Sequence, residues 1–230
     1  EEQVLEEQVR FRANQVQIGD HCLSWEDFIQ TAYMHRISLS SSGFYATPKI
    51  HYDHDAGQGR PFLYYTNSAA CSEVVVDTLT GEYRVLRTDI LHDAGRSLNP
   101  AIDMGQIEGG FIQGMGWLTT EELVYSAEGR LLTTGPATYK IPAVSDCPPD
   151  LRVALLKDSP NHEATVFHSK AVGEPPFMLG ISVWSALRDA VSSLSDYRFS
   201  PPLDTPATPE RVLNAVTETR RWVNQQENGQ

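Results

Sequence analysis

The stretch Ser169–Phe177, SKAVGEPPF, places one carboxylate, Glu174, between a glycine and two prolines. Proline disfavours the helical region for the residue before it and suits the first turn of a helix. We therefore expect Glu174 to have non-helical backbone angles, just before a helix that continues over residues 177–194. Gly173 has no β-carbon, so a backbone segment or a bulky ligand can come close to this carboxylate. The sequence predicts a rigidly held acid at a helix N-terminus.

Glu174 has an ordinary interpretation as well as a catalytic one. A carboxylate beside a helix N-terminus is stabilised by the helix dipole by a few tenths to about 1 kcal/mol. Because this arrangement is common and catalytic acids are rare, the spacing by itself favours the ordinary interpretation.

A second unusual segment precedes this stretch in the chain. Asn99 and Pro100 predict the capped start of a helix over Ala101–Leu123. Glycine in a helix interior costs about 1 kcal/mol relative to alanine, so the glycines of this helix need a reason. Those glycines are Gly105, Gly109, Gly110, Gly114 and Gly116. A bare helix face predicts either close packing on a neighbouring element or contact with a large flat ligand.

Gln106 lies among these glycines and carries both a carbonyl acceptor and amide donors. Such a side chain suits the polar edge of a flat heterocycle, although the residue pattern alone favours an ordinary solvent-facing glutamine. Large apolar residues on the two helices are expected in the core rather than at a ligand. They are Met115, Trp117, Met178 and Trp184.

Strands and helices alternate irregularly over the rest of the chain. Residues 62–93 predict a β-hairpin with its bend at 79–82, and residues 152–158 predict a strand. A proline-rich linker follows residue 199, and Pro209 predicts the start of a polar terminal helix. The absence of a regular βαβ order favours the α+β class.

The first 40 residues predict a small hairpin followed by a helix. Turn residues at 13–14 and 19–20 separate short β-type runs. The sequence SWED, from Ser24 to Asp27, resembles a capping box ahead of a helix over Trp25–His35. We expect one domain portion over residues 1–199, with this hairpin and helix as its lead-in, and a linker plus helix over 200–230.

Composition excludes several classes of protein. The chain has 230 residues, 40% of them hydrophobic and 21% charged, which is ordinary for a globular protein. Its formal charge of −12 opposes nucleic-acid binding, which needs concentrated positive charge. No apolar run has membrane length, and the acidic start does not resemble a secretory signal, so we expect no membrane partner and a cytoplasmic location.

The cysteines and histidines do not predict a metal site. Cys22, Cys71 and Cys147 are dispersed and odd in number, which fits buried reduced thiols and cannot supply an iron–sulfur cluster. His51 and His54 would point to opposite faces of a strand. Neither a GxGxxG loop after a strand nor a nucleotide-hydrolysing GxxxxGK[ST] loop occurs.

Several blocks resemble the molybdenum hydroxylases, and SKAVGEPPF resembles the active-site segment of the xanthine dehydrogenase branch. The pairs Ala171-Val172 and Pro175-Pro176 favour this branch over the aldehyde oxidases. The further blocks, in the family's order, are residues 36–50, 93–116, 134–143 and 205–212. The resemblance identifies the chain as the C-terminal part of a molybdopterin-binding portion, built from two-layer units of mixed sheet and helix.

The resemblance also implies roles for individual residues. Glu174 corresponds to the general base beside the molybdenum, and Gln106 to a glutamine that hydrogen-bonds the molybdopterin. Ala171, Val172 and Gly173 would present backbone near the cofactor. The pterin dithiolene holds the metal in this family, so we expect no protein side chain to ligate molybdenum.

The implied activity is oxidative hydroxylation of purines, hypoxanthine to xanthine to urate, within a larger assembly. A further molybdopterin-binding lobe would share the cofactor, and iron–sulfur and FAD domains or subunits would carry the electrons away. The isolated chain is expected to have little or no activity. Two alternatives stay open: a sister enzyme acting on aldehydes or other N-heterocycles, and a non-catalytic interaction module that retains the fold.

Overall fold

The computed structural model describes residues 6–228 and divides the chain into two compact units. The first unit ends at Arg60 and the second begins at Pro61. The boundary near residue 199 that we expected from the sequence stays a prediction. Among residues 6–228, no helix is both long and apolar enough to cross a membrane.

The first unit contains a small antiparallel sheet, a helix and a separate hairpin. The sheet has the order β1-β2-β3, so a third strand joins the predicted hairpin. Ala13 and Asn14 both have positive φ angles in the turn between β1 and β2, as tight hairpin turns require. The elements are η1 (Glu6–Gln8), β1 (Val9–Arg12), β2 (Gln15–Ile18), β3 (His21–Ser24), α1 (Trp25–Met34), β4 (His51–Asp53) and β5 (Gln58–Arg60).

Helix α1 begins where the capping pattern predicts. The Ser24 hydroxyl accepts a hydrogen bond from the Asp27 N–H at 3.0 Å, which satisfies one of the free amides of the first turn. The Ser24 hydroxyl in turn donates to the Asp27 carboxylate at 2.8 Å. Trp25 and Phe28 of this helix pack against Phe11 of β1 through edge-on ring contacts.

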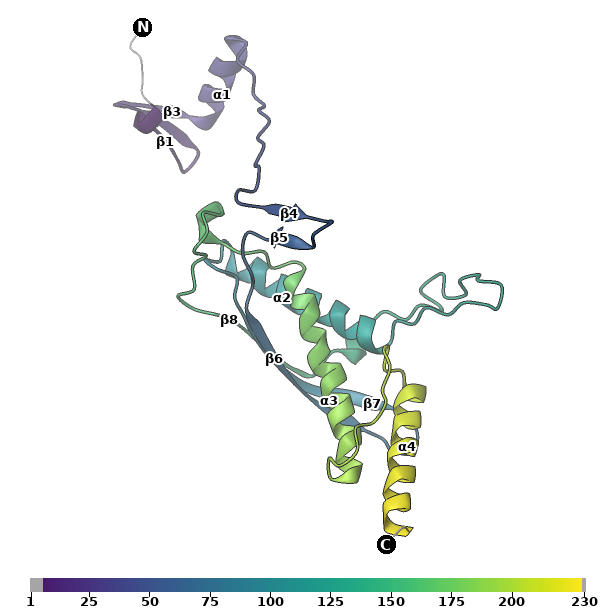
Figure 1. Cartoon of the computed structure of the whole chain (residues 1–230). Coiled ribbons are helices and arrows are strands. Elements are labelled where there is room, and N and C mark those ends of the chain that lie inside the picture. The colour runs from purple at the N-terminus through teal and green to yellow at the C-terminus, as the bar shows by residue number, and fades with distance from the viewer. Residues whose placement is uncertain (1–5, 229–230) are drawn as a thin grey trace. The chain divides into compact units, whose positions relative to one another are not determined.

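The second unit is a three-stranded sheet covered by helices (Figure 1). Strands β6 (Ser68–Val76) and β7 (Tyr83–His92) form the predicted hairpin, and β8 (Asp150–Leu155) pairs with β7 in parallel. The turn between β6 and β7 contains Gly81 at φ +78°, a conformation that L-residues rarely adopt. This mixed sheet with helices packed on it confirms the α+β class.

Helix α2 (Pro100–Thr119) starts as predicted, because the Asn99 side chain caps the Ile102 N–H at 3.4 Å. It ends four residues earlier than expected. The Gly116 carbonyl accepts from both the Thr120 and Glu121 N–H groups, which closes the last turn.

The segment after Glu174 is divided rather than one continuous α-helix. The tight 3₁₀ turns of η4 (Pro175–Gly180) lead into α3 (Ile181–Ser192), and the 3₁₀ turn η5 (Ser193–Ser195) ends it. The terminal helix α4 (Pro209–Asn228) begins at the predicted proline. Two further short 3₁₀ turns of this unit are η2 (Val144–Asp146) and η3 (Val166–His168).

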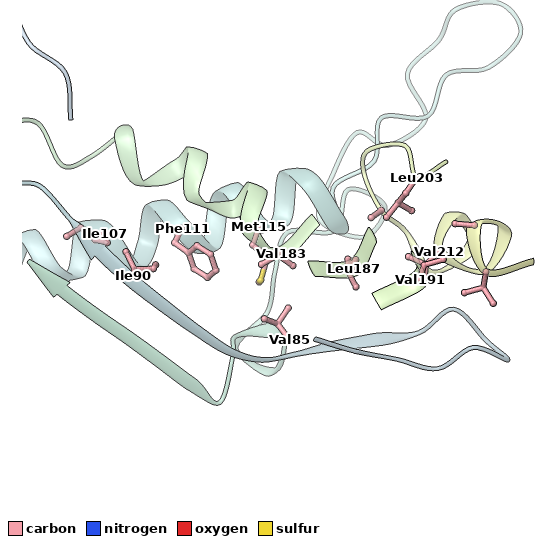
Figure 2. Close-up of a cluster of buried hydrophobic side chains, with 13 residues drawn as sticks. Val85, Ile90, Ile107, Phe111, Met115, Val183, Leu187, Val191, Leu203 and Val212 are labelled. Atoms are coloured by element: carbon pink, nitrogen blue, oxygen red, sulfur yellow. The ribbon is translucent and has the colours of Figure 1, made fainter. Parts of the chain in front are cut away.

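The hydrophobic core lies between the sheet and the helices (Figure 2). Helix α2 contributes three buried residues at a spacing of four, and α3 contributes three more at the same spacing, as expected for faces buried along helices. Leu203 and Val212 show that the chain after residue 199 packs on this same core. The six helix residues are Ile107, Phe111, Met115, Val183, Leu187 and Val191.

The expectation that four large apolar residues lie in the core is partly wrong. Met115 is buried, and Trp184 packs against the core while partly exposed. Trp117 is 49% exposed and Met178 is 50% exposed. Trp117 lies outside the buried face of α2 and contacts the Phe177 ring at 5.3 Å between centroids, so it packs over the surface of the α2–η4 contact.

His92, at the end of β7, is a fully buried polar side chain. Its Nδ1 lies 2.7 Å from the Ser68 hydroxyl oxygen, while its Nε2 has no hydrogen-bond partner among the described residues. Burial lowers the pKa of His92, and the nearby carboxylates of Asp93 and Asp103 oppose this shift only in part. The imidazole is therefore held neutral in the fold.

The lowered pKa predicts that His92 destabilises the fold in acid. Below about pH 6.5 the unfolded chain binds a proton that the folded chain does not, so stability falls as pH falls through this range. His92→Met removes the titrating group and fills a similar volume with an apolar side chain. We expect its melting temperature to exceed the wild-type value by about 2–4 °C near pH 5.5, and by less near pH 7.5. His162→Met changes an exposed histidine and serves as the control; an equal difference at both pH values would contradict this assignment.

Candidate functional site

The site predicted around Glu174 begins with a loop that a β-bridge and two hydrogen bonds attach to segments beside the sheet. Ser169 forms an isolated β-bridge with Gly95, which follows β7. The Lys170 N–H donates to the Ala94 carbonyl at 2.9 Å. The Ala171 N–H donates to the Tyr64 hydroxyl oxygen at 3.0 Å. The loop is therefore held immediately before it reaches Glu174.

Glu174 occupies the residue before η4, as predicted, but its backbone is helical. Its φ of −94° and ψ of −39° contradict the extended conformation that we expected before a proline. The Glu174 carbonyl accepts from the Phe177 N–H at 3.0 Å, so the residue closes the first 3₁₀ turn and takes the angles that this turn requires. The local steric preference is outweighed by this turn.

The Glu174 side chain is exposed in this chain. Within the described residues it accepts no capping hydrogen bond from η4, so the carboxylate is not used to satisfy the helix end. The ordinary interpretation, stabilisation by the helix dipole, does not require such a bond and stays a prediction. An exposed carboxylate next to a residue without a β-carbon is accessible to a ligand or to another part of a larger assembly.

A row of α2 residues brings Gln106 to the same place. Gln106, Gly110 and Gly114 are four residues apart and so lie along one side of the helix. A β-carbon on Gly114 would lie 1.9 Å from the Phe177 carbonyl oxygen, and one on Gly110 would lie 3.2 Å from the Gly173 carbonyl oxygen. Gln106 continues this row. Its Oε1 lies 3.6 Å from the position that a β-carbon on Gly173 would take.

The glycines of α2 therefore have two different explanations. Gly110 and Gly114 permit the backbone of residues 173–180 to approach closely, and Gly116 permits a similar contact with Pro142. Gly105 and Gly109 differ, because a β-carbon on either would meet no described atom within 4 Å. Close packing therefore explains Gly110, Gly114 and Gly116. Gly105 and Gly109 instead leave an open face of the helix beside Gln106.

Of the other predicted site residues, Ala171 and Gly173 are exposed and Val172 is half-buried. Val172 and Gly173 lie between Ala171, the last anchored residue of the loop, and Glu174. Within residues 6–228 there is no cluster of three or more His, Cys, Asp or Glu side chains that could hold a metal ion. The polar groups that the structure describes at the site are the Gln106 amide, the Glu174 carboxylate and main-chain groups.

A groove of about 860 Å³ lies elsewhere, between β6 and α3. Residues 70–74 line one wall and residues of the range 178–190 line the other, without Glu174 or Gln106. Its walls carry Cys71, Glu73 and Asp189 but no cluster that could hold a metal. Because neither Glu174 nor Gln106 lines this groove, the groove is separate from the candidate site.

An ion pair that the sequence pattern does not predict joins the loop to the end of β7. Lys170 Nζ lies 2.5 Å from Oδ2 of Asp93, with the two side chains only 10% and 2% exposed. Burial by itself raises the pKa of Asp93, but the hydrogen bonds from Lys170 and from the Gly95 N–H outweigh it, so the pKa is lowered. Lys170 belongs to the stretch that we singled out, whereas its partner is 77 residues away and no local pattern joins them.

Comparison with known proteins assigns the family. A model of the family described as "Molybdopterin cofactor-binding domain" matches residues 2–148, which is more than half of the chain. The chain belongs to this family. The matched range contains Gln106 and the glycines of α2, while Glu174 lies beyond it.

Relatives extend the likeness through the Glu174 segment. The chain is 53% identical over 199 residues to a xanthine dehydrogenase/oxidase of Gallus gallus and 46% identical over 211 residues to a xanthine dehydrogenase of Oryza sativa subsp. japonica. These matches cover 85% and 87% of the chain but 15% of each relative. The chain thus spans about 15% of the length of these relatives. The predicted resemblance to a molybdopterin-binding part of xanthine dehydrogenase type is confirmed.

Solved structures confirm the fold. Quinoline 2-oxidoreductase from Pseudomonas putida 86 matches with a TM-score of 0.65 and 26% identity, over 92% of this chain and 26% of that one. A CO dehydrogenase from Oligotropha carboxidovorans matches with a TM-score of 0.64 and 18% identity, over 95% of this chain and 26% of that one. At such identity the second match bears on the fold alone.

The residues at the site fit a flat pterin cofactor. The open helix face at Gly105 and Gly109 has no β-carbon to obstruct a planar group, and Gln106 presents an exposed amide beside it. The amide can both donate and accept, which matches the mixed edge of a pterin. Gly173 of the exposed loop lies next to Gln106.

Proposed function

We propose that this chain is part of a xanthine dehydrogenase-type enzyme that oxidatively hydroxylates purines, hypoxanthine to xanthine to urate. The observation that carries the proposal is the placement of Gln106 beside Gly173, directly before the exposed carboxylate of Glu174. A pterin-contacting amide and a catalytic base are thereby brought close together, although Gln106 and Glu174 lie 68 positions apart in the sequence. The family match and the xanthine dehydrogenase relatives support this assignment.

Glu174 is the general base of the proposed reaction. Its Oε atom would accept a proton from the oxygen that attacks the electron-poor purine carbon, at hydrogen-bond distance. Gly173 leaves room for the reacting groups, and the 3₁₀ turn of η4 fixes the main chain behind the carboxylate. When bound, the molybdenum–pterin group supplies the oxidation of the substrate, with water as the source of oxygen.

The binding residues act by orientation. We propose that Gln106 hydrogen-bonds the pterin edge, and that Ala171, Val172 and Gly173 present backbone next to the cofactor. A further lobe of the molybdopterin-binding part would complete the pocket. Iron–sulfur and FAD domains or subunits are the proposed electron carriers, because dispersed cysteines such as Cys22, Cys71 and Cys147 do not supply the clustered thiolates of an iron–sulfur centre. A cytoplasmic location stays a prediction.

A second candidate is a sister hydroxylase for other N-heterocycles or aldehydes. The likeness to a quinoline 2-oxidoreductase at 26% identity favours it specifically, because that protein is named for an N-heterocycle other than a purine. Both candidates share the chemistry assigned to Glu174. A non-catalytic module that retains the fold is the remaining alternative.

The test is an assay of the complete enzyme that contains this chain, on xanthine and on an aromatic aldehyde. We expect turnover of xanthine to exceed turnover of the aldehyde, and we expect molybdenum and pterin to be present by metal and fluorescence analysis. The purified 230-residue chain is the control and is expected to have little or no activity, because it provides only part of the pocket. Aldehyde turnover alone would support the sister enzyme, and absence of molybdenum and pterin would support the non-catalytic module.

A further inference from the structure

The loop that carries Glu174 is anchored on both sides of a very short free stretch. On its C-terminal side, Pro176 and Phe177 pack against the glycines of α2. On its N-terminal side, the main-chain bonds of Lys170 and Ala171 attach it to the segments beside the sheet. Val172 and Gly173 separate Glu174 from the N-terminal anchor, and Pro175 separates it from the C-terminal one. The position of the carboxylate therefore depends directly on where Lys170 is held.

The Lys170 side chain joins three segments that are far apart in the sequence. Its Nζ donates to Asp93 Oδ2 at 2.5 Å and to the Tyr65 carbonyl at 3.0 Å. Asp93 uses its other oxygen, Oδ1, to accept the Gly95 N–H at 2.9 Å. The end of β7, the segment before β6 and the Glu174 loop thus meet at one ammonium group.

The geometry of this pair is costly to build for stability alone. The free energy needed to remove two charges from water offsets most of their mutual attraction. Apolar pairs of similar volume often stabilise a fold equally well. In this pair both carboxylate oxygens of Asp93 are bonded, so the pair fixes the positions of the segments that it joins. A displacement of about 1 Å at a reacting group can lower a rate about 100-fold, so such definition has a large effect on catalysis.

We propose that Lys170, through its ion pair with Asp93, is a positioning residue for Glu174. It does not contact the reacting groups. It fixes the position of the loop so that Glu174 can reach the attacking oxygen. The Tyr64 hydroxyl assists by accepting a hydrogen bond from the Ala171 N–H. This inference rests on the proposed function, because it assigns Lys170 to the base of that reaction.

The test compares three variants in the complete enzyme. Lys170→Met removes the ammonium and leaves Asp93 as a buried, unpaired carboxylate. The double variant Asp93→Asn, Lys170→Met removes both charges together. Glu174→Gln reports on the proposed function itself. Each is measured for melting temperature, for molybdenum and pterin content, and for kcat and KM on xanthine.

We expect Lys170→Met to lower kcat about 10- to 100-fold with KM and cofactor content little changed, and to lower the melting temperature. In the double variant the melting temperature should recover, because no buried charge is left unpaired, while kcat stays low. Recovery of kcat together with the melting temperature would show that the pair acts only in stability and would overturn the proposal. Unchanged kcat in the single variant would overturn it as well.

Tyr64→Phe keeps the test decisive if Lys170→Met does not fold. It removes only the hydroxyl that accepts the Ala171 N–H, and we expect kcat to fall several-fold with the melting temperature nearly unchanged. Wild-type kcat in this variant would then count against the positioning role. If Glu174→Gln also turned over normally, the proposed function would fail, whereas normal turnover confined to the Lys170 and Tyr64 variants would overturn only this inference.

Discussion

Glu174→Gln in the complete enzyme is expected to lower turnover of xanthine about 10²- to 10⁴-fold. The substitution keeps the shape of the side chain and removes its ability to accept a proton. In this chain the carboxylate makes no capping hydrogen bond to η4 among the described residues, so its loss should leave the fold intact. Steady-state kinetics on xanthine and metal analysis of the same preparation measure both effects.

Glu218→Gln provides a matched control. Glu218 is an exposed glutamate on α4, so the same chemical change there should leave turnover at the wild-type value. Glu174→Asp adds a test of reach, because it retains the carboxylate but withdraws it by one methylene. We expect its turnover to lie between that of the wild type and Glu174→Gln. Normal turnover of a cofactor-loaded Glu174→Gln enzyme would rule out Glu174 as the base.

Gly114→Ala is expected to destabilise the protein by about 1–3 kcal/mol, although alanine favours helices over glycine by about 1 kcal/mol. The added β-carbon would lie 1.9 Å from the Phe177 carbonyl oxygen, and backbone cannot rotate away as a side chain can. η4 must therefore move off α2. Because Glu174 directly precedes η4, turnover should fall with stability. Thermal unfolding and xanthine kinetics of the complete enzyme check the two effects.

Gly109→Ala is the matched control for this packing effect. It lies on the same helix, but its β-carbon would meet no described atom within 4 Å. We expect its melting temperature to equal or exceed the wild-type value, since only the helix preference changes. If both alanine variants were equally stable, the close contact of α2 with η4 would not be a determinant of the fold.

Local chemistry explains which parts of the fold were predictable. Ser24 and Asn99 cap helices through contacts within a single turn, so the starts of α1 and α2 could be predicted. The hairpin of β6 and β7 was also predictable, because its turn residues lie between two strand-like runs. These features need no information from distant parts of the chain.

Non-local contacts explain the expectations that were wrong. Glu174 was expected outside the helical region, but the 3₁₀ turn that packs on α2 imposes helical angles on it. Trp117 was expected in the core by its apolar character, yet it lies beside Phe177 over the surface of the α2–η4 contact. Apolar character indicates a tendency to bury, whereas the neighbouring elements decide which face of a helix is covered.

The sequence by itself determined the family of this protein and predicted its site residues, Glu174 in the SKAVGEPPF stretch and Gln106 in the glycine-rich helix. The resemblance of several sequence blocks to the family gave these assignments, because spacing alone favoured ordinary roles for both side chains. Only the tertiary structure decided that Gln106 lies beside Gly173 and that Lys170 pairs with Asp93 beneath the loop. These contacts join residues 67 and 77 positions apart, as the difference between 173 and 106 and between 170 and 93. The packing of helices, strands and loops against one another creates these contacts, so no local sequence pattern predicts them.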